Sequence, residues 1–444
     1  MLLLRRLSVA PALLGCLGLG LAGQAVPPAL SSDPTVIAQT VSTLSPIRSA
    51  GQPQVTNFFD FGFGTQTGYT DHVNGSTSSA GSAFELLNGE VDVRQERGGL
   101  NWALSYAPSY EWYRAGLGLD QFNQTGALDL SGRLNEHWYL RLDDQASYGR
   151  YLLNPAAFNA NSPLNVTVSA PNRRMYSQTP SASLIYVASY RSYFVFSGDF
   201  LTRQYSGDAS GLTNMEGAGG SASYQYRLSA LSTLGAQYSY ENASFGHGTG
   251  HMVSQTAFLT YTHLFNARTK IALGAGPQRV HETENLLQMF GVPAGGTLPI
   301  PTLAVQPYHT YWAGRASINH ESGLTALSLS AQESVSDSGG FLASAARVTS
   351  VTGGIGRRFL DAWHVDLDAS YARMTAANLV GARGTFQSAS ASGGIERQLG
   401  RDWSLSARFT STRQRQNGNL PFGPNFNSNA VTLGLSYHLR LARG

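Results

Sequence analysis

Apolar and polar residues alternate along most of this chain, from Val55 to its end. In one such run Leu100 and Trp102 share one face of an extended backbone, while Asn101 and Ser105 share the other. Because successive side chains of a strand point to opposite faces, this period of two predicts β-strands with one apolar and one polar face. Clusters of Gly, Ser, Asn and Asp separate the runs, and no helical period lasts three turns.

The alternation predicts eighteen strands, and an even count places both ends of the series on one side. The period is weakest in three of the runs (55–69, 192–204 and 347–359), so sixteen strands is the alternative. The predicted strands are 55–69, 84–96, 100–112, 126–134, 138–150, 176–189, 192–204, 218–229, 232–243, 253–265, 269–281, 308–320, 323–335, 347–359, 362–374, 385–398, 402–414 and 429–441.

The length of these runs favours a membrane barrel over a soluble sandwich. Soluble strands average about five or six residues, whereas a tilted membrane-spanning strand needs about 9–11. The connections also alternate strictly between short, such as 97–99, and long, such as 70–83. Outer-membrane barrels have short periplasmic turns and long extracellular loops. The pattern therefore predicts an all-β fold, a transmembrane antiparallel up-and-down β-barrel.

The six tryptophans fit the same arrangement. Four follow a short turn directly and two lie near a long loop, and all six share the apolar face of their strands. Indole rings at both ends of the outward face form the aromatic girdles of a membrane barrel. We expect these membrane-interface residues to be Trp102, Trp112, Trp138, Trp312, Trp363 and Trp403. The alternative is a set of core tryptophans in a soluble β protein.

From residue 55 to its end the chain resembles the bacterial outer-membrane β-barrel proteins and is porin-like in size. The last predicted strand is similar to the assembly signal of that family, carried here by Thr432, Gly434, Tyr437 and Leu439. The resemblance implies a Gram-negative outer-membrane location and contact with the barrel-assembly machinery during biogenesis. Family members often end on an aromatic residue, whereas here Leu439 is followed by five more residues.

The N-terminal segment has the layout of a cleaved secretory signal peptide over residues 1–25. Arg5 and Arg6 precede an apolar stretch that ends in small residues at Ala25. An N-terminal membrane anchor, or a lipid attached at Cys16, are the alternatives. Residues 26–54 are rich in Pro, Ser and Ala, which predicts a flexible periplasmic segment before the barrel at 55–444.

Composition narrows the function. Charged residues make up 13% of the chain and the formal net charge is +3, which gives no basic stripe for nucleic acid. Cys16 is the single cysteine, so a disulfide scaffold and a Cys-ligated metal are excluded. No spacing resembles a nucleophile elbow, a metalloprotease helix or a phosphate-binding loop. We expect the protein not to be an enzyme and to have no catalytic residue, cofactor or metal. The alternative is a metal ion held by His247 and His251 of one long loop.

A barrel of this size has a lumen too wide for side chains to fill, so it is expected to be aqueous unless something plugs it. Alternation places charges of both signs on the inward faces, where they hydrate the lumen or pair with one another. These pore-lining candidates are Arg141, Asp143, Arg227, Glu241, Arg315, Asp366, Asp368, Glu396 and Arg408. By the porin resemblance, the third long loop (151–175) folds inward and makes Arg173 and Arg174 constriction residues.

The sequence thus predicts a porin-like channel for passive diffusion of small polar solutes. Two other functions stay open: a barrel for surface polysaccharide export or anchoring, and a structural or adhesive surface barrel. The expected partners are outer-membrane lipid, small polar solutes or saccharides, and further copies in a homotrimer. The transported solute and the open or closed state of the pore do not follow from the sequence.

Overall fold

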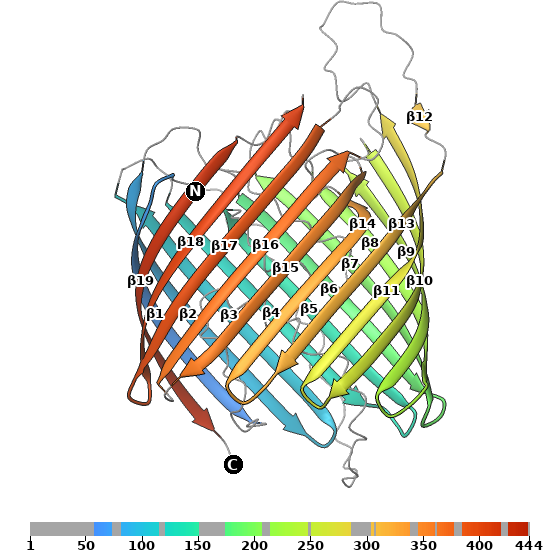
Figure 1. The fold of residues 1–444 in the computed structure, drawn as a ribbon, viewed down its shortest axis with the longest axis horizontal. Coiled ribbons are helices and arrows are strands. Elements are labelled where there is room, and N and C mark those ends of the chain that lie inside the picture. The colour runs from blue at the N-terminus through green and yellow to red at the C-terminus, as the bar shows by residue number, and fades with distance from the viewer. Residues whose placement is uncertain are drawn as a thin grey trace, which may run out of the picture.

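Eighteen antiparallel strands form a closed ring in the computed structural model (Figure 1). It describes residues 57–72, 81–114, 120–150, 174–206, 214–246, 250–285, 303–305, 308–337, 345–359, 362–376, 384–418 and 425–442. Each ring strand pairs with its neighbours in sequence, and β1 closes the ring by pairing with β19 as well as β2. A short further strand, β12, pairs with β11 beside the ring.

The strands are β1 (Phe58–Thr70), β2 (Ser82–Arg97), β3 (Leu100–Tyr113), β4 (Gln121–Arg133), β5 (Trp138–Arg150), β6 (Arg174–Val187), β7 (Ser192–Ser206), β8 (Met215–Arg227), β9 (Ser232–Phe245), β10 (Gly250–Asn266), β11 (Thr269–Asn285), β12 (Leu303–Val305), β13 (His309–Glu321), β14 (Thr325–Asp337), β15 (Ala345–Phe359), β16 (Trp363–Ala376), β17 (Gly384–Leu399), β18 (Trp403–Gly418) and β19 (Phe426–Ala442). The structure therefore confirms the prediction of an all-β barrel with eighteen membrane-length strands.

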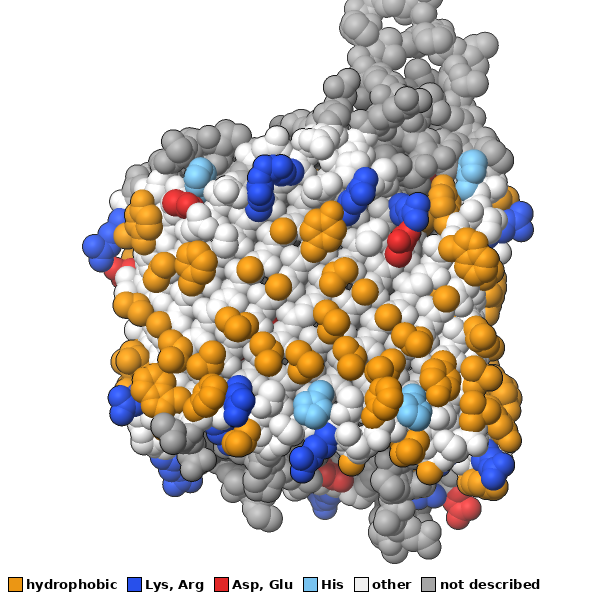
Figure 2. Space-filling view, in the orientation of Figure 1, with side chains coloured by type: hydrophobic (Ala, Val, Ile, Leu, Met, Phe, Trp, Pro, Cys, Tyr) orange, Lys and Arg blue, Asp and Glu red, His pale blue; other side chains and the backbone are white. Residues whose placement is uncertain are grey.

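The two faces of the wall differ as the alternation predicts. On β1, Phe59, Phe61 and Phe63 are 41–43% exposed, whereas the alternating residues Phe58 and Asp60 are buried. Exposed aliphatic and aromatic side chains recur on the outward face of most other strands, and Figure 2 shows apolar side chains spread over one side of the barrel. Because the ring is closed, no strand edge is left with unpaired backbone groups, so a barrel of this kind can span a bilayer. Its apolar outward face then contacts the lipid.

The short connections lie at one end of the barrel and the long ones at the other (Figure 1). Gly98 and Gly99 join β2 to β3 with φ angles of 61° and 85°, a left-handed conformation that glycine adopts without strain. Between β4 and β5, the side chain of Asn135 accepts hydrogen bonds from the backbone N–H groups of His137 and Trp138, at 2.9 and 3.0 Å. Local turn chemistry thus fixes the register of the hairpins at this end.

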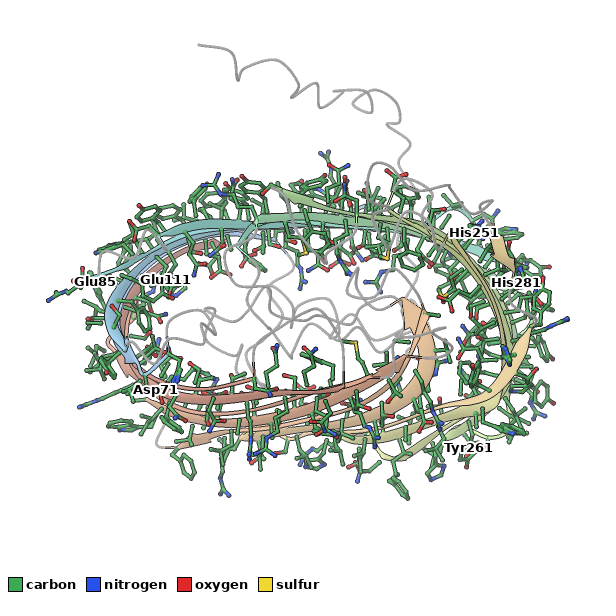
Figure 3. The ribbon with its side chains drawn as sticks, turned by 90° about the horizontal axis from the view of Figure 1, so that it is seen from above. Asp71, Glu85, Glu111, His251, Tyr261 and His281 are labelled. Atoms are coloured by element: carbon green, nitrogen blue, oxygen red, sulfur yellow. The ribbon has the colours of Figure 1, made fainter. Side chains whose placement is uncertain are left out.

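The ring is irregular at the outer end of β14. The β13–β14 ladder runs from Glu321↔Ala326 to Gly314↔Glu333, while the remainder of β13 stays paired with β11. Beyond Glu333 the strand contacts β10 and β11 instead, and Figure 3 shows ribbon ends curling into the ring. The outer ends of β14 and β15 therefore overlap the inner face of the wall.

The side chain of Gln278 on β11 replaces the missing strand partner. Its Nε2 donates to the carbonyl of Val335 and its Oε1 accepts from the N–H of Val335, both at 2.7 Å. Glu282, four residues further along β11 and on the same face, accepts a hydrogen bond of 2.6 Å from the N–H of Ala345. Two polar side chains thus satisfy backbone groups that the ladder no longer pairs.

Apolar side chains gather on the inner face beside this overlap, at the long-loop end of the barrel. Eight of them form one buried cluster, which Tyr311 adjoins. Its members are Leu201, Met215, Ala243, Phe245, Met252, Val280, Val335 and Ala345, each at most 4% exposed. The inward face therefore carries an apolar patch at the long-loop end of β7 to β11, beside the overlap.

No helix among the described residues has the length and apolar character to cross a membrane. The structure differs from the predicted elements mainly at the strand ends. β11 continues to Asn285 and β19 begins at Phe426, so both enter segments expected to be loops. The proposed leader and periplasmic segment (1–54) lie outside the described residues.

Candidate functional site

Two clusters of charged side chains lie in the lumen, and each holds one arginine and two aspartates. In the first, the Arg141 guanidinium of β5 lies 2.7 Å from Asp129 on β4 and 2.9 Å from Asp143 on its own strand. All three side chains are at most 28% exposed. Asp129 and Asp143 are directly paired across the β4–β5 ladder, so the arginine separates two carboxylates that would otherwise repel each other.

The second cluster lies on β16 and β18. Arg408 contacts Asp366 at 2.6 Å and Asp368 at 3.7 Å, and it donates a hydrogen bond of 3.0 Å to Ser392 on the intervening strand. Asp366 is nearly buried, whereas the side chain of Asp368 is 51% exposed. The cluster therefore presents one carboxylate to the lumen and keeps the other against the wall.

Glycines make room for this cluster. Gly394 faces Asp366 across the ladder, and a Cβ atom there would lie 2.6 Å from Asp366 Oδ1 and 3.1 Å from the guanidinium of Arg408. Gly354 faces Asp368 in the same way, with a separation of 2.6 Å from Asp368 Oδ1. These side chains thus lie flat along the wall over glycines rather than standing out into the lumen.

Both clusters lie at the same depth. Tryptophans start three strands at the short-turn end: Trp138, Trp363 and Trp403. Five residues after each tryptophan comes a charged member of a cluster: Asp143, Asp368 and Arg408, respectively. Because side chains alternate between the two faces of a strand, an odd separation from an outward tryptophan places each of them on the inward face. Since β4 and β5 belong to one long wall of the flattened ring and β16 to β18 to the other, the clusters face each other across the lumen (Figure 3).

The other sequence-predicted lumen residues are spread along the wall. Arg315 lies over Gly274, donates a hydrogen bond of 2.9 Å to Gln237 and has its guanidinium 5.3 Å from the ring centre of Phe258. Glu241 is buried beside Gly219, half-buried Glu396 pairs with His364, and Arg227 ends β8 at the short turns. The structure thus does not bring these four into either cluster.

Sequence reasoning missed several luminal acids, among them Asp129 and Asp199. Asp129 completes the first cluster, and Asp199 lies over Gly219, whose Cβ would be 2.7 Å from Asp199 Oδ1. The alternation of the sequence could have identified both acids. Asp129 directly follows outward Leu128 and Asp199 directly precedes outward Phe200, so each acid must lie on the inward face. The constriction candidates are placed differently: Arg173 lies outside the described residues, and exposed Arg174 alternates with buried Met175.

The tryptophans lie on the outward face. Trp312 is 76% exposed, Trp138 packs on Tyr186 with ring centres 4.7 Å apart, and the guanidinium of Arg397 covers Trp363 at 5.2 Å. In the last strand, the predicted assembly signal forms part of the ring closure. Tyr437 packs on Trp403 of β18 at 5.0 Å and on Phe63 of β1 at 6.4 Å. Their roles at the membrane interface and in assembly stay predictions.

A lipid-facing apolar exterior, a closed antiparallel ladder and a charged lumen together decide the class of the protein. The chain is a membrane-type β-barrel of porin-like architecture. Among the residues that the structure describes, no three His, Cys, Asp or Glu side chains form a group fit to hold a metal ion. Of the two histidines considered as metal ligands, His247 lies outside those residues, and His251 is on the outward face of β10, as Figure 3 shows.

No protein-family model matches the chain, and no curated protein matches it. Several solved outer-membrane structures are similar in fold. OccK2 (OpdF) of Pseudomonas aeruginosa is 14% identical over 87% of this chain and 98% of that chain, with a TM-score of 0.41. OpdO of the same species is 14% identical over 87% of this chain and 97% of that chain, with a TM-score of 0.42. The unliganded ferric citrate transporter FecA is 15% identical over 88% of this chain and 66% of that chain, with a TM-score of 0.44. Likenesses at this level say nothing about the solute.

Proposed function

We propose that the protein is an outer-membrane channel for the passive diffusion of small polar solutes. The observation that carries this proposal is the pair of Asp–Arg–Asp clusters facing each other at one depth of an eighteen-stranded lumen. Charged groups stay ionised where water reaches them, and a barrel of this width leaves space for water between its walls. The half-exposed carboxylate of Asp368 is a direct contact point for a passing solute.

The charge of the clusters sets the preferred sign of the solute. Each cluster holds two carboxylates and one guanidinium, so each has a formal charge of −1. Two clusters of the same sign on facing walls make the potential between them negative, which raises the local concentration of cations. The proposed channel therefore prefers small cationic and neutral polar solutes over anions.

The remaining sequence predictions belong to this proposal. We propose export by a leader over residues 1–25, an extended segment at 26–54, and residence in the outer membrane of a Gram-negative bacterium. Contact with the assembly machinery through β19 and association into a homotrimer are part of the same hypothesis. Arg173 is kept as a proposed constriction residue of the third long loop. Arg174 is not, because it begins β6 on the face opposite to buried, inward Met175.

Single-channel recording in planar bilayers tests the function. The full-length protein is expressed, purified from outer membranes and checked by the shift of the folded band on a heat-modifiability gel. We expect stable conductance steps that grow with salt concentration and a reversal potential that indicates cation preference in a KCl gradient. A folded barrel without conductance would overturn the channel proposal and favour the export, anchoring or adhesive alternatives.

A further inference from the structure

Arginines form a row on the outward face of β16 and β18 at the long-loop end. Arg373 of β16 and Arg415 of β18 are both paired with Gln387 of β17, which places the three residues side by side across the wall. Arg413 lies two residues before Arg415 on the same face. All three arginines are exposed, and Figure 2 shows basic side chains along the upper edge of the apolar area.

The position of the row relative to the bilayer follows from the strand lengths. Arg373 is the tenth residue after Trp363, and Arg413 is the tenth residue after Trp403. Ten residues rise about 33 Å along a strand, which a tilt of about 40° reduces to about 25 Å, the height of the apolar band of such barrels. With tryptophans at the periplasmic interface, the arginines lie at the headgroups of the outer leaflet.

These arginines differ from three other outward arginines at this end. Arg347 is bonded to Glu333, Arg114 lies 2.7 Å from Glu85, and Arg279 stacks on Tyr308 with 3.9 Å between guanidinium and ring centre. Among the described residues, no carboxylate forms an ion pair with Arg373, Arg413 or Arg415. The row is therefore a set of cations whose counter-ion must come from outside the chain.

A shallow, open pocket of about 430 Å³ lies at the β18 end of the row. It is lined by Arg413, Gln414, Arg415, Asn417, Asn425 and Asn427. Two guanidinium groups and several amides in one concave site offer many N–H donors, which is the donor set that suits the oxygens of a phosphate group.

Apolar side chains lie directly below the pocket on the same face. Phe409 and Val431 are paired across the β18–β19 ladder and are 50% and 51% exposed. Leu433 continues this surface toward the short turns and is 55% exposed. A ligand that joins a phosphorylated headgroup to acyl chains would contact both the donors and this apolar surface.

We propose that Arg373, Arg413, Arg415 and the asparagines of the pocket bind the phosphate of a phosphorylated glycolipid in the outer leaflet. The guanidinium groups of β16 and β18 are two strands apart, about 10 Å between backbones, so both side chains can reach one headgroup. This site is independent of the lumen and needs no open channel.

Native mass spectrometry of the full-length protein tests the proposal, with lipid A carrying its two phosphates as the probe. We expect retention of the phosphorylated lipid and at least tenfold weaker retention of the fully dephosphorylated form. The double variant R413Q/R415Q should lose affinity for the phosphorylated lipid by at least tenfold, and R373Q by a smaller factor. Equal retention of both lipids, or wild-type retention by the double variant, would overturn the site.

The matched control removes the same charge at the other end of the barrel. Arg357 and Arg397 are outward arginines near the short turns, each over an aromatic ring, at 5.0 and 5.2 Å. R357Q/R397Q should retain the lipid as the wild type does. If it loses as much lipid affinity as R413Q/R415Q, the effect comes from the net charge of the protein and not from the proposed site. Displacement of the lipid by millimolar inorganic phosphate would assign the site to a soluble ligand and overturn the lipid proposal. A heat-modifiability gel confirms that each variant is folded.

Discussion

Asp71 and Asn429 exchange hydrogen bonds where the first and last strands of the barrel meet. The N–H of Asp71 donates to the carbonyl of Asn429 at 3.1 Å. In return, the carboxylate of Asp71 accepts from the backbone N–H of Asn429 at 2.6 Å and from its side-chain amide at 2.7 Å. The β1–β19 ladder thus ends on a side-chain clasp at its outer end.

The clasp predicts a pH-dependent contribution to stability. Partial burial raises the pKa of Asp71, but the hydrogen bonds from Asn429, with help from His72, outweigh this and hold the pKa below its usual value. Because the folded-state pKa is the lower one, the stabilisation is present above about pH 4 and is lost as pH falls through the folded value. In D71N, the fraction of folded protein should therefore fall less steeply between about pH 4 and pH 2 than in the wild type. A heat-modifiability gel measures this fraction after incubation at each pH.

The control for this variant is E136Q, which removes an exposed carboxylate in the short turn before β5. It should leave the acid limb unchanged. If D71N and the wild type lose the folded band at the same pH values, the clasp does not contribute to the acid stability of the barrel.

Ion selectivity should respond to each charge of the β16–β18 cluster in a defined direction. R408Q removes the cation and leaves both carboxylates. One charge at about 6 Å in water changes the local concentration of each ion about threefold, up for cations and down for anions, so the cation-to-anion permeability ratio should rise about tenfold. D368N should lower the ratio by a similar factor. Reversal potentials in a KCl gradient measure both, and outward R397Q should leave the ratio at the wild-type value.

Gly394 should be intolerant of even a methyl group. In G394A the new Cβ lies 2.6 Å from Asp366 Oδ1, so the aspartate or Arg408 must move away from the wall. Overpacking of this kind costs about 1–3 kcal/mol, and we expect a lower unfolding midpoint in urea together with altered ion selectivity. G314A is the control, because the nearest atom to its Cβ is 3.7 Å away. Equal midpoints for the two variants would contradict the packing argument.

The inward-folded end of β14 should depend on Gln278. Q278L removes the donor and acceptor that pair with Val335, so two buried backbone groups lose their partners at about 1–3 kcal/mol each. We expect a lower thermal midpoint and faster labelling of a cysteine introduced at Ser334. S254A, which loses the hydrogen bond between Ser254 and Gln278 alone, should have a smaller effect. Unchanged labelling in Q278L would show that other contacts hold this segment.

The sequence predicted the barrel because its alternation is a local property that each strand repeats. The outward direction of Leu433 and Phe409, for example, follows from the alternation within their own strands, and the neighbouring strands need not be known. The pairing of Asp129 with Arg141 could have been found from the register of the hairpin between them, since the turn at Asn135 is short. The overlap at Gln278 could not, because its partner Val335 is 57 residues away and the residue keeps the ordinary alternation of a ring strand.

The outer end of β14 also sets where the ring would yield under force. The ladder that joins the first strand to the last has thirteen residue pairs, whereas the β13–β14 ladder has eight. A pulling load applied across the wall is shared among the hydrogen bonds of one ladder, so the shorter ladder carries more per bond. The mechanical weak line of this barrel is therefore in the interior of the chain, and tearing should begin between β13 and β14 while the join of the two termini still holds.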